Sequence, residues 1–409
     1  MDLFQLNNDE KTNLQTILKK YKICDFCIGR IFSNNNSIQS FQSIGKRVRE
    51  EYTINKISSV ETCELCDGLI NEIQFFKDLI LNSVNTYEFS SFVIGFHVDH
   101  DILKREEEVF LLFKDKHNEY IKVFLKKSIG KIIETEINKT VSFDDADIMI
   151  VVNTMFNSVD LQIKPLYIYG RYNKLKRGIP QSKWFCRSCG GCGCRDCQYT
   201  GTLYQDSVEE LIAELLLKHA DGNGESFHGS GREDIDVRML GTGRPFIIEI
   251  SNPKKRSIDL KKITYEINLK CKDQIKVSKL RFSNKEEVIR IKETKFSKIY
   301  EISFEAEKPF KTEKLKKVAL TLRGTIIQQF TPTRVAHRRA KKVRPRQIYD
   351  CSVVSIKNNR ACFRIESASG TYIKELVTGD EGRTQPSISE LIGQPCKVIT
   401  LDVMEIKGE

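Results

Sequence analysis

The chain has 409 residues, 40% of them hydrophobic and 30% charged, as in folded globular proteins and unlike disordered ones. It contains no run of about 18 apolar residues and no basic-then-apolar N-terminus, so we expect neither a membrane protein nor a secreted one, and we place it in the cytoplasm. Lysine and arginine outnumber aspartate and glutamate by 66 to 55, and this net charge of +11 suits a polyanionic partner.

The first 70 residues carry two C-x₂-C pairs, Cys24 with Cys27 and Cys63 with Cys66. In a chain that is not secreted, cysteines are metal ligands or reduced thiols rather than disulfides. Zinc takes four thiolates in a tetrahedron, and each pair places two sulfurs on one turn. Residues 1–70 are therefore predicted to be a zinc-binding N-terminal segment, with buried thiols as the alternative.

Residues 71–165 alternate short apolar runs with amphipathic stretches, which predicts a small α/β domain. Residues 166–205 are expected to be a turn-rich connector that is first basic and then dense in cysteine. A second structural zinc site is predicted there, with Cys192 left over, at Cys186, Cys189, Cys194 and Cys197. Because only four residues separate the two pairs, partial use of this cluster is the alternative.

Residues 206–409 are predicted to form a sheet-dominated α+β domain. Ser207 and Glu210 have capping-box spacing, so a helix is expected from Val208 to the turn at Asp221-Gly222. GREDIDVRML and RPFIIEI then flank Gly241-Thr242-Gly243, which predicts a β-hairpin. Further strands are expected at Val288–Ile291, Tyr300–Phe304, Ala361–Ile365 and Val398–Val403.

The acidic part of that hairpin is a candidate active site. On a strand, Asp234, Asp236 and Arg238 would share one face, while Ile235 and Val237 would point into the core. Carboxylates between apolar neighbours and arginines can stay ionised yet poorly solvated, which suits a nucleophile or a general base. A salt-bridged structural hairpin is the alternative.

Two basic stretches favour a nucleic-acid partner. Residues 170–178 interleave arginine and lysine with an aromatic ring, and Arg334–Arg346 holds seven basic residues and no acidic one. Such clustering fits phosphate contacts made by a loop or an extended segment.

Four motifs together resemble one enzyme family. GREDIDVRMLGTGRPFIIEI, GRYNKLKRGIPQSKW, TPTRVAHRRA and SGTYIKEL are similar to segments of the archaeal and eukaryotic THUMP-containing tRNA pseudouridine synthases that act on the T-loop. GTYIKEL is also similar to a segment of the bacterial synthase for tRNA position 55. The resemblance is strong over about residues 166–405. It implies a zinc-containing accessory domain, with a THUMP-like RNA-binding domain at 71–165, followed by a mixed-sheet pseudouridine synthase domain at 206–409.

The resemblance also implies roles for individual residues. Asp234 takes the position of the indispensable aspartate, which attacks the ribose or abstracts its proton, and Asp236 is its competitor. Tyr300 matches the tyrosine that stacks on the target base and acts as late general base, and Lys374 matches the cation paired with the aspartate. The residues then expected to line the substrate site are Tyr372, Ile373, Leu401, Arg232, Arg334, Arg338 and Arg339.

We therefore expect an enzyme that isomerises a flipped-out uridine at tRNA position 54, 55 or both. Catalysis is expected to need no cofactor, and zinc to be structural. The T-arm is expected to bind at Arg334–Arg346 and the acceptor end at residues 71–165. A non-catalytic zinc-containing RNA-binding protein is the alternative.

Overall fold

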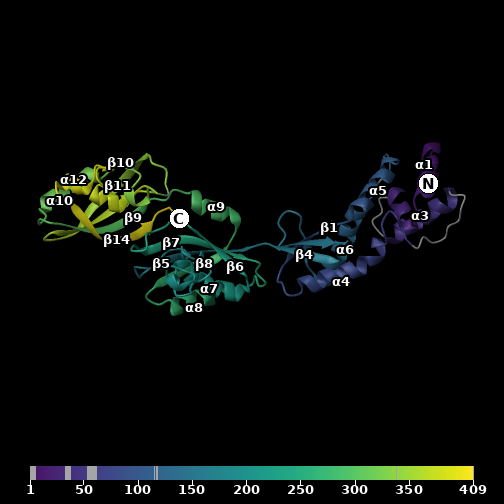
Figure 1. The fold of residues 1–409 in the computed structure, drawn as a ribbon, viewed down its shortest axis with the longest axis horizontal. Coiled ribbons are helices and arrows are strands. Elements are labelled where there is room, and N and C mark those ends of the chain that lie inside the picture. Colours follow the sequence, from purple (N-terminus) through teal and green to yellow (C-terminus); the bar gives the residue numbers. More distant parts are fainter. Residues whose placement is uncertain are drawn as a thin grey trace. The chain divides into compact units, whose positions relative to one another are not determined.

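The computed structural model describes residues 6–32, 38–52, 62–114, 116, 118–337 and 339–408. The chain divides into two compact units, one of residues 1–164 with 252–256 and one of residues 165–251 with 257–409 (Figure 1). Each unit has its own large hydrophobic core. Among the described residues, no helix is long and apolar enough to cross a bilayer.

The first unit combines a group of N-terminal helices with a small sheet. Its elements are α1 (Asn8–Lys20), α2 (Asp25–Phe32), α3 (Ile38–Tyr52), η1 (Leu69–Glu72), α4 (Ile73–Val84), β1 (Ser91–His97), α5 (His100–Leu111), α6 (Ile121–Ile137), β2 (Thr140–Val141), β3 (Ile148–Asn153) and β4 (Ser158–Ile163). The sheet order is β2-β1-β3-β4, and only β3 with β4 is antiparallel. Helices and sheet share one core, which joins residues of the predicted segments 1–70 and 71–165.

Residues 252–256, which come much later in the chain, complete the first unit. The Glu88 N–H donates to the carbonyl of Lys254 over 2.7 Å, and the Arg256 N–H donates to the Glu88 carboxylate over 2.7 Å. The Arg256 guanidinium, which is largely buried, also donates to the carbonyls of Asp147 and Lys164. The chain consequently passes between the two units three times.

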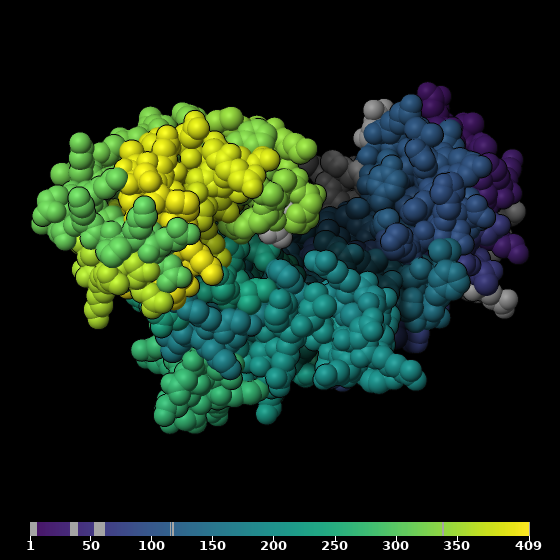
Figure 2. Space-filling view, turned by 60° about the vertical axis from the view of Figure 1, so that its left-hand side comes forward, coloured from purple at the N-terminus to yellow at the C-terminus, as the bar shows by residue number. Residues whose placement is uncertain are grey.

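The second unit is built on one large sheet. Its elements are β5 (Leu166–Lys174), η2 (Arg195–Cys197), α7 (Val208–Ala220), β6 (Gly224–Gly229), β7 (Arg238–Ser251), α8 (Leu260–Lys270), β8 (Ile275–Ser283), α9 (Lys285–Glu293), β9 (Lys298–Ala306), α10 (Thr312–Leu322), β10 (Ile326–Phe330), η3 (Thr333–Val335), β11 (Val343–Lys357), β12 (Arg360–Ser367), α11 (Ile373–Thr378), β13 (Thr384–Gln385), α12 (Ile388–Ile392) and β14 (Cys396–Ile406). The sheet order is β13-β10-β11-β12-β9-β14-β7-β5-β8, and β6 pairs with β7. β14 is parallel to β7 and antiparallel to β9, and Figure 2 shows the C-terminal residues (yellow) lying against green segments of this unit.

Several predicted elements are confirmed. Helix α7 begins after Ser207, whose hydroxyl accepts from the Glu210 N–H over 3.1 Å, and it ends at Asp221 with a φ of 48°. The strands predicted at Tyr300–Phe304, Ala361–Ile365 and Val398–Val403 lie within β9, β12 and β14.

The strand predicted at Val288–Ile291 is wrong, because these residues lie in helix α9. Asn284 caps that helix by accepting from the Glu287 N–H over 3.0 Å. Val288 and Ile291 are buried, and their spacing of three places them on one helical face. A run of four residues is too short to separate this period from that of a strand.

The predicted hairpin around Gly241-Thr242-Gly243 is also wrong. β7 continues through these residues, with a register irregularity against β5 between Tyr172 and Lys174. Its hairpin partner is β6, and residues 230–237 form the loop between them. The two glycines do not form the turn of a hairpin. They are needed because neighbouring strands come very close to the backbone of β7 here. A Cβ on Gly241 would lie 1.8 Å from the carbonyl oxygen of Met404, and one on Gly243 would lie 2.8 Å from that of Tyr172.

The first part of the predicted connector 166–205 is a strand and not a turn-rich segment. Leu166–Lys174 forms β5, which is paired on both sides and buried at all but one position. The basic stretch at 170–178, predicted to contact nucleic acid, therefore has Arg171, Tyr172 and Lys174 inside the protein. Their polar groups are used internally, and Arg171 donates to the carbonyls of Thr242 and Gly243 over 2.8 and 2.9 Å.

Candidate active site

The loop that carries Asp234 is fixed by buried cations. The Lys174 ammonium donates to the carbonyls of Asp234 and Ile235 over 3.1 and 3.3 Å, and Arg244 donates to that of Ser230 over 2.7 Å. Because the chain turns here, strand alternation does not apply. Val237 is buried as predicted, whereas Ile235 is only half-buried.

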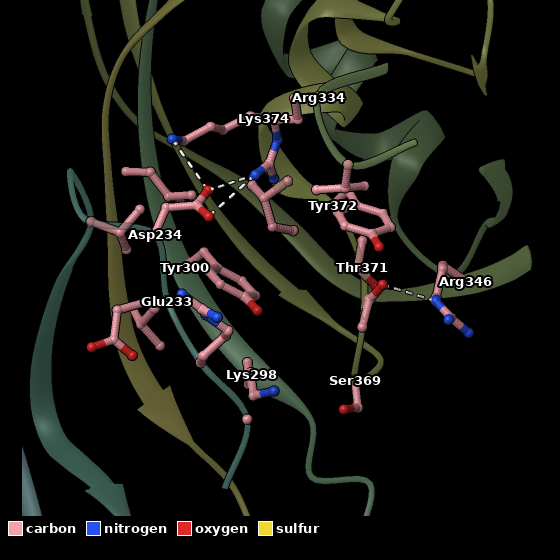
Figure 3. Close-up of a pocket in the computed structure, with 18 of the residues that line it drawn as sticks. Glu233, Asp234, Lys298, Tyr300, Arg334, Arg346, Ser369, Thr371, Tyr372 and Lys374 are labelled. Atoms are coloured by element: carbon pink, nitrogen blue, oxygen red, sulfur yellow. Dashed lines mark hydrogen bonds and ion pairs between the residues drawn. The ribbon is translucent and has the colours of Figure 1, made fainter. Parts of the chain in front are cut away.

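The Asp234 carboxylate lies between two cations. Its Oδ2 is 3.0 Å from Arg334 Nη1 and 3.4 Å from Lys374 Nζ, and Figure 3 shows both side chains pointing toward it. Arg334 belongs to the short helix η3, and its Nε donates to the buried Glu375 over 2.6 Å. Lys374 belongs to helix α11. Two cations at this distance hold the carboxylate in place by charge-assisted contacts.

Asp236 lies beside the same lysine but faces solvent. Both of its carboxylate oxygens are 2.8 Å from Lys374 Nζ, and its side chain is 67% exposed, against 35% for Asp234. Partial burial raises the pKa of Asp236, but the hydrogen bonds and charge of Lys374 outweigh this and bring it below its usual value. Asp236 does not line the cavity next to Asp234.

A cavity of about 270 Å³ opens beside the Asp234 carboxylate. This is close to the lower end of the ligand-pocket range of about 300–1,000 Å³, a size that suits one nucleotide. The predicted residues that line it are Arg232, Asp234, Tyr300, Arg334, Arg339, Tyr372, Ile373, Lys374 and Leu401. Arg338 lies outside the described residues.

Aromatic and apolar side chains form part of the cavity wall. Tyr300 is buried on β9, and burial raises its pKa to about 12 despite the opposing charge of Arg244, so its hydroxyl is neutral near pH 7. The backbone of Tyr372 exchanges two hydrogen bonds of 2.9 Å with the buried amide of Gln329. Leu401 of β14 is buried and lines the same space.

A buried charge cluster supports the site from below. The Glu233 carboxylate is 2.8 Å from Arg244 Nε, accepts from the Tyr172 hydroxyl over 2.8 Å, and is 3.9 Å from Lys174 Nζ. Sequence reasoning missed this cluster and also the pocket residue Lys298, because charged residues are ordinarily expected at the surface. The sequence feature that could have indicated these buried charges is the aromatic and apolar run LYIYG, which leads directly into RYNK.

The basic stretch Arg334–Arg346 starts in the helical turn η3, continues as a loop and enters β11. The predicted loop or extended form is therefore found for its described residues after Val335, but not for Arg334. Three of its arginines join Arg334 in the cavity wall, namely Arg339, Arg344 and Arg346. Arg339 is exposed, while Arg346 is half-buried and donates to the carbonyl of Gly370 over 3.1 Å. The wall next to the aspartate is therefore strongly positive.

The four cysteines predicted as the first zinc site lie together in the first unit. The sulfurs of Cys24, Cys27, Cys63 and Cys66 are all within 4.8 Å of one another. Four sulfurs about 2.3 Å from zinc would be separated by about 3.8 Å, and the Cys24–Cys66 distance is 4.0 Å. The buried Arg30, which is paired with Glu106, donates to Cys27 Sγ over 3.4 Å and supplies positive charge beside the cluster. The donor set fits zinc.

The second predicted cysteine set also lies together. The sulfurs of Cys186 and Cys194 are 3.8 Å apart, and those of Cys189 and Cys197 are 3.9 Å apart. Backbone N–H groups of Cys194 and Gly201 donate to Cys197 Sγ over 3.1 and 3.3 Å, an outer shell that suits a metal-bound thiolate. Cys192 is exposed and outside the set. This donor set fits zinc too.

Two family models match the chain. The model described as "Pus10, C-terminal" matches residues 167–407, and the model described as "Pus10 THUMP domain, archaeal" matches residues 76–153. The tRNA pseudouridine synthase Pus10 of Methanopyrus kandleri is 34% identical over 97% of this chain and 98% of its own. That of Methanothermobacter marburgensis is 38% identical over 94% and 95%. A chain of a solved Cbf5-Nop10-Gar1 complex aligns at 16% identity over 58% of this chain and 48% of its own, with a TM-score of 0.32, too distant to support a conclusion.

The chain is therefore a pseudouridine synthase with a THUMP domain. It belongs to the Pus10 family, whose archaeal members named above are called tRNA pseudouridine synthases. The predicted family, α+β fold class and enzyme class are confirmed.

Proposed function

We propose that this enzyme isomerises uridine to pseudouridine at position 54, position 55 or both in the T-loop of tRNA. Asp234 acts as nucleophile or base on a uridine that has flipped out of the RNA into the adjacent cavity. The observation that carries the proposal is the place of the Asp234 carboxylate, which borders the cavity between Arg334 and Lys374.

The geometry supports Asp234 over Asp236. Asp234 lines the cavity with Tyr300 and Leu401, whereas Asp236 faces solvent with both oxygens bound by Lys374. A nucleophile has to reach the reacting ribose, and only the first carboxylate borders a space that can hold one. Asp236 instead holds Lys374 in place.

The other cavity residues have distinct tasks in this proposal. Tyr300 stacks on the target base, and late in the reaction its neutral hydroxyl accepts a proton as it passes its own to solvent. Leu401 and Ile373 pack against the base. Lys374 and Arg334 hold the Asp234 carboxylate in position by ion pairs. The exposed arginines Arg232 and Arg339 bind phosphates next to the flipped nucleotide.

We assign the partner as tRNA, with the T-arm on Arg334–Arg346 and the acceptor end on the THUMP domain, and the location as the cytoplasm. Both cysteine clusters hold structural zinc, which would cross-link chain segments and supply no catalytic step. The isomerisation moves one bond from nitrogen to carbon within the substrate, so we assign it no cofactor.

The test is an incubation of the purified protein with an unmodified tRNA transcript, followed by carbodiimide mapping of pseudouridine in the T-loop. Asp234→Asn is expected to lower the single-turnover rate by at least about 10³-fold while tRNA binding stays within twofold. Asp236→Asn is the matched control, and we expect it to retain measurable activity.

The opposite pattern, with Asp236→Asn inactive and Asp234→Asn active, would transfer the role to Asp236. A wild-type protein that binds tRNA and zinc but forms no pseudouridine would favour the alternative of a non-catalytic RNA-binding protein.

A further inference from the structure

Lys298 is a buried lysine in the wall of the cavity to which the proposed function gives no task. It is only 8% exposed, and its ammonium makes no hydrogen bond or ion pair with any residue that the structure describes. Figure 3 shows its side chain beside Tyr300 in the wall of the pocket. A charge withdrawn from water without a partner is costly, so its retention there indicates a ligand.

The carboxylate of Glu233, whose charge acts on this lysine, is already engaged. Glu233 forms its ion pair with Arg244 and accepts from Tyr172, and its charge only partly offsets the burial and the Arg244 charge that lower the pKa of Lys298. Lys298 Nζ and Arg244 Nη1 approach the same point, since a Cβ on Gly231 would lie 3.3 Å from each. Burial first, and the charge of Arg244 second, lower the pKa of Lys298 to about 8.

The position of Lys298 favours a base rather than a phosphate as its ligand. Lys298 and Tyr300 are two residues apart on β9, where the burial pattern alternates, so both side chains are on the inner face. The exposed cation Arg339 and the half-buried Arg344 and Arg346 also line the cavity and suit the RNA backbone. A ring stacked on Tyr300 would present its polar edge within reach of a neighbouring ammonium.

We propose that Lys298 is a catalytic residue whose ammonium donates a hydrogen bond to a carbonyl oxygen of the flipped uracil and stabilises the negative charge on the detached base. This inference rests on the proposed function, because it takes the cavity as the uridine site. It adds a group that would act on the base, whereas Asp234 acts on the sugar.

The charge arises in the isomerisation itself. When the N1–C1′ bond breaks, its electron pair stays on the uracil and spreads to the carbonyl oxygens, while Asp234 bonds to the sugar or takes its proton. After the base turns, an electron pair from C5 forms the new bond to C1′ as the Asp234–C1′ bond breaks or, in the other route, as Asp234 returns the proton to the sugar. C5 then loses its proton, which the Tyr300 hydroxyl relays to solvent, and N1 gains a proton from solvent. Lys298 keeps its protons throughout and contributes as a fixed hydrogen-bond donor in the buried part of the cavity wall.

The test uses Lys298→Met, which keeps the length of the side chain and removes the charge. We expect the single-turnover rate on the tRNA transcript at saturating enzyme to fall about 10²–10³-fold, as when an oxyanion donor is removed, with the tRNA Kd within twofold. Lys397→Met is the control, since Lys397 is exposed on β14 and does not line the cavity. It is expected to match the wild type.

Two further readouts separate catalysis from structure. The wild-type rate should fall as pH rises through about 8, where Lys298 loses its proton, and this falling limb should be absent in Lys298→Met. The folded protein binds that proton less tightly than the unfolded chain does, so the ammonium opposes folding at pH 7 and Lys298→Met should leave Tm unchanged or higher.

An unchanged rate in Lys298→Met would overturn the assignment. So would a lower Tm together with a rate that recovers on cooling, because that pattern belongs to a structural lysine. If Lys298→Met is active while Asp234→Asn is not, only the role of Lys298 fails. If both variants are active, the proposed function fails at this site.

Discussion

Glu233 sits directly before the proposed nucleophile, and its side chain is 1% exposed. Its carboxylate compensates Arg244 and lies near Lys174, two cations that fix the backbone of the Asp234 loop. The single buried carboxylate of Glu233 thus keeps in place the two cations that support the Asp234 loop. Removing one partner of a buried ion pair costs more than the pair contributes, since the other charge is left without compensation.

We therefore expect Glu233→Gln to lower the free energy of unfolding by about 3–5 kcal/mol, measured by urea denaturation. Tyr172→Phe is the matched control, because it removes only a hydroxyl that bonds to Glu233 and Gln181, and should cost about 1 kcal/mol. Equal effects of the two changes would show that the charge of Glu233 is not what stabilises the loop.

At the level of single residues, sequence motifs predicted the side chains that face the cavity better than those beneath it. Asp234, Tyr300, Lys374 and Leu401 were found through motifs and do line one cavity. Glu233 and Lys298 were not found, since their burial results from the packing of β5, β7 and β9, strands that are far apart in sequence. The sequence next to a charged residue does not show whether distant strands will bury it.

The Cys-rich segment after β5 is a compact element in which glycines make the tight turns possible. Gly193 has a φ of 88°, and a Cβ there would lie 2.8 Å from the carbonyl oxygen of Tyr199. The segment connects to the site through Trp184, because the guanidinium of Arg232 lies 5.7 Å from the centre of its ring. Order in this segment therefore affects an arginine that lines the cavity.

We expect Cys189→Ser to lower the zinc content from about two ions per chain to about one and to lower Tm, because a structural zinc adds its binding free energy to folding. Cys192→Ser is the matched control, since Cys192 is exposed and outside the cluster. Zinc released on unfolding, measured with a colorimetric indicator, checks the prediction. An unaltered zinc content in Cys189→Ser would contradict it.

At the level of elements, local signals succeeded where they were complete. Helix α7 has a capping residue, a long apolar face and a stop, and all three are visible in the sequence. The hairpin prediction failed because Gly241 and Gly243 imitate a turn, although they are needed where Met404 and Tyr172 of neighbouring strands approach the backbone. Those neighbours are set by the order of the sheet, which no short segment specifies.

At the level of the whole molecule, the net charge of +11 does not by itself say where RNA binds. Phosphate contacts are expected only where several cations lie close together on the surface. The exposed part of the loop between β10 and β11, with Arg339, Lys341 and Lys342, is the best candidate. Each phosphate contact changes the slope of log Kd against log salt by about 0.7–0.9.

We expect the triple change Arg339→Gln, Lys341→Gln and Lys342→Gln to reduce that slope by about 2–3 for tRNA, measured by filter binding across salt concentrations. The control variant changes Lys314, Lys316 and Lys317 to glutamine, since these lysines are exposed on α10 and do not line the cavity. If both variants reduce the slope equally, binding depends on total charge and not on the loop.

The short segment 252–256 also sets the order in which the protein is completed during synthesis. Domains generally fold from the N-terminus as the chain emerges. Arg256 donates hydrogen bonds to the carbonyls of Asp147 and Lys164. This arginine is synthesised only after β5, α7, β6 and β7. The first unit therefore lacks these hydrogen bonds until much of the second sheet has left the ribosome, and a chain that stops at residue 164 never forms them.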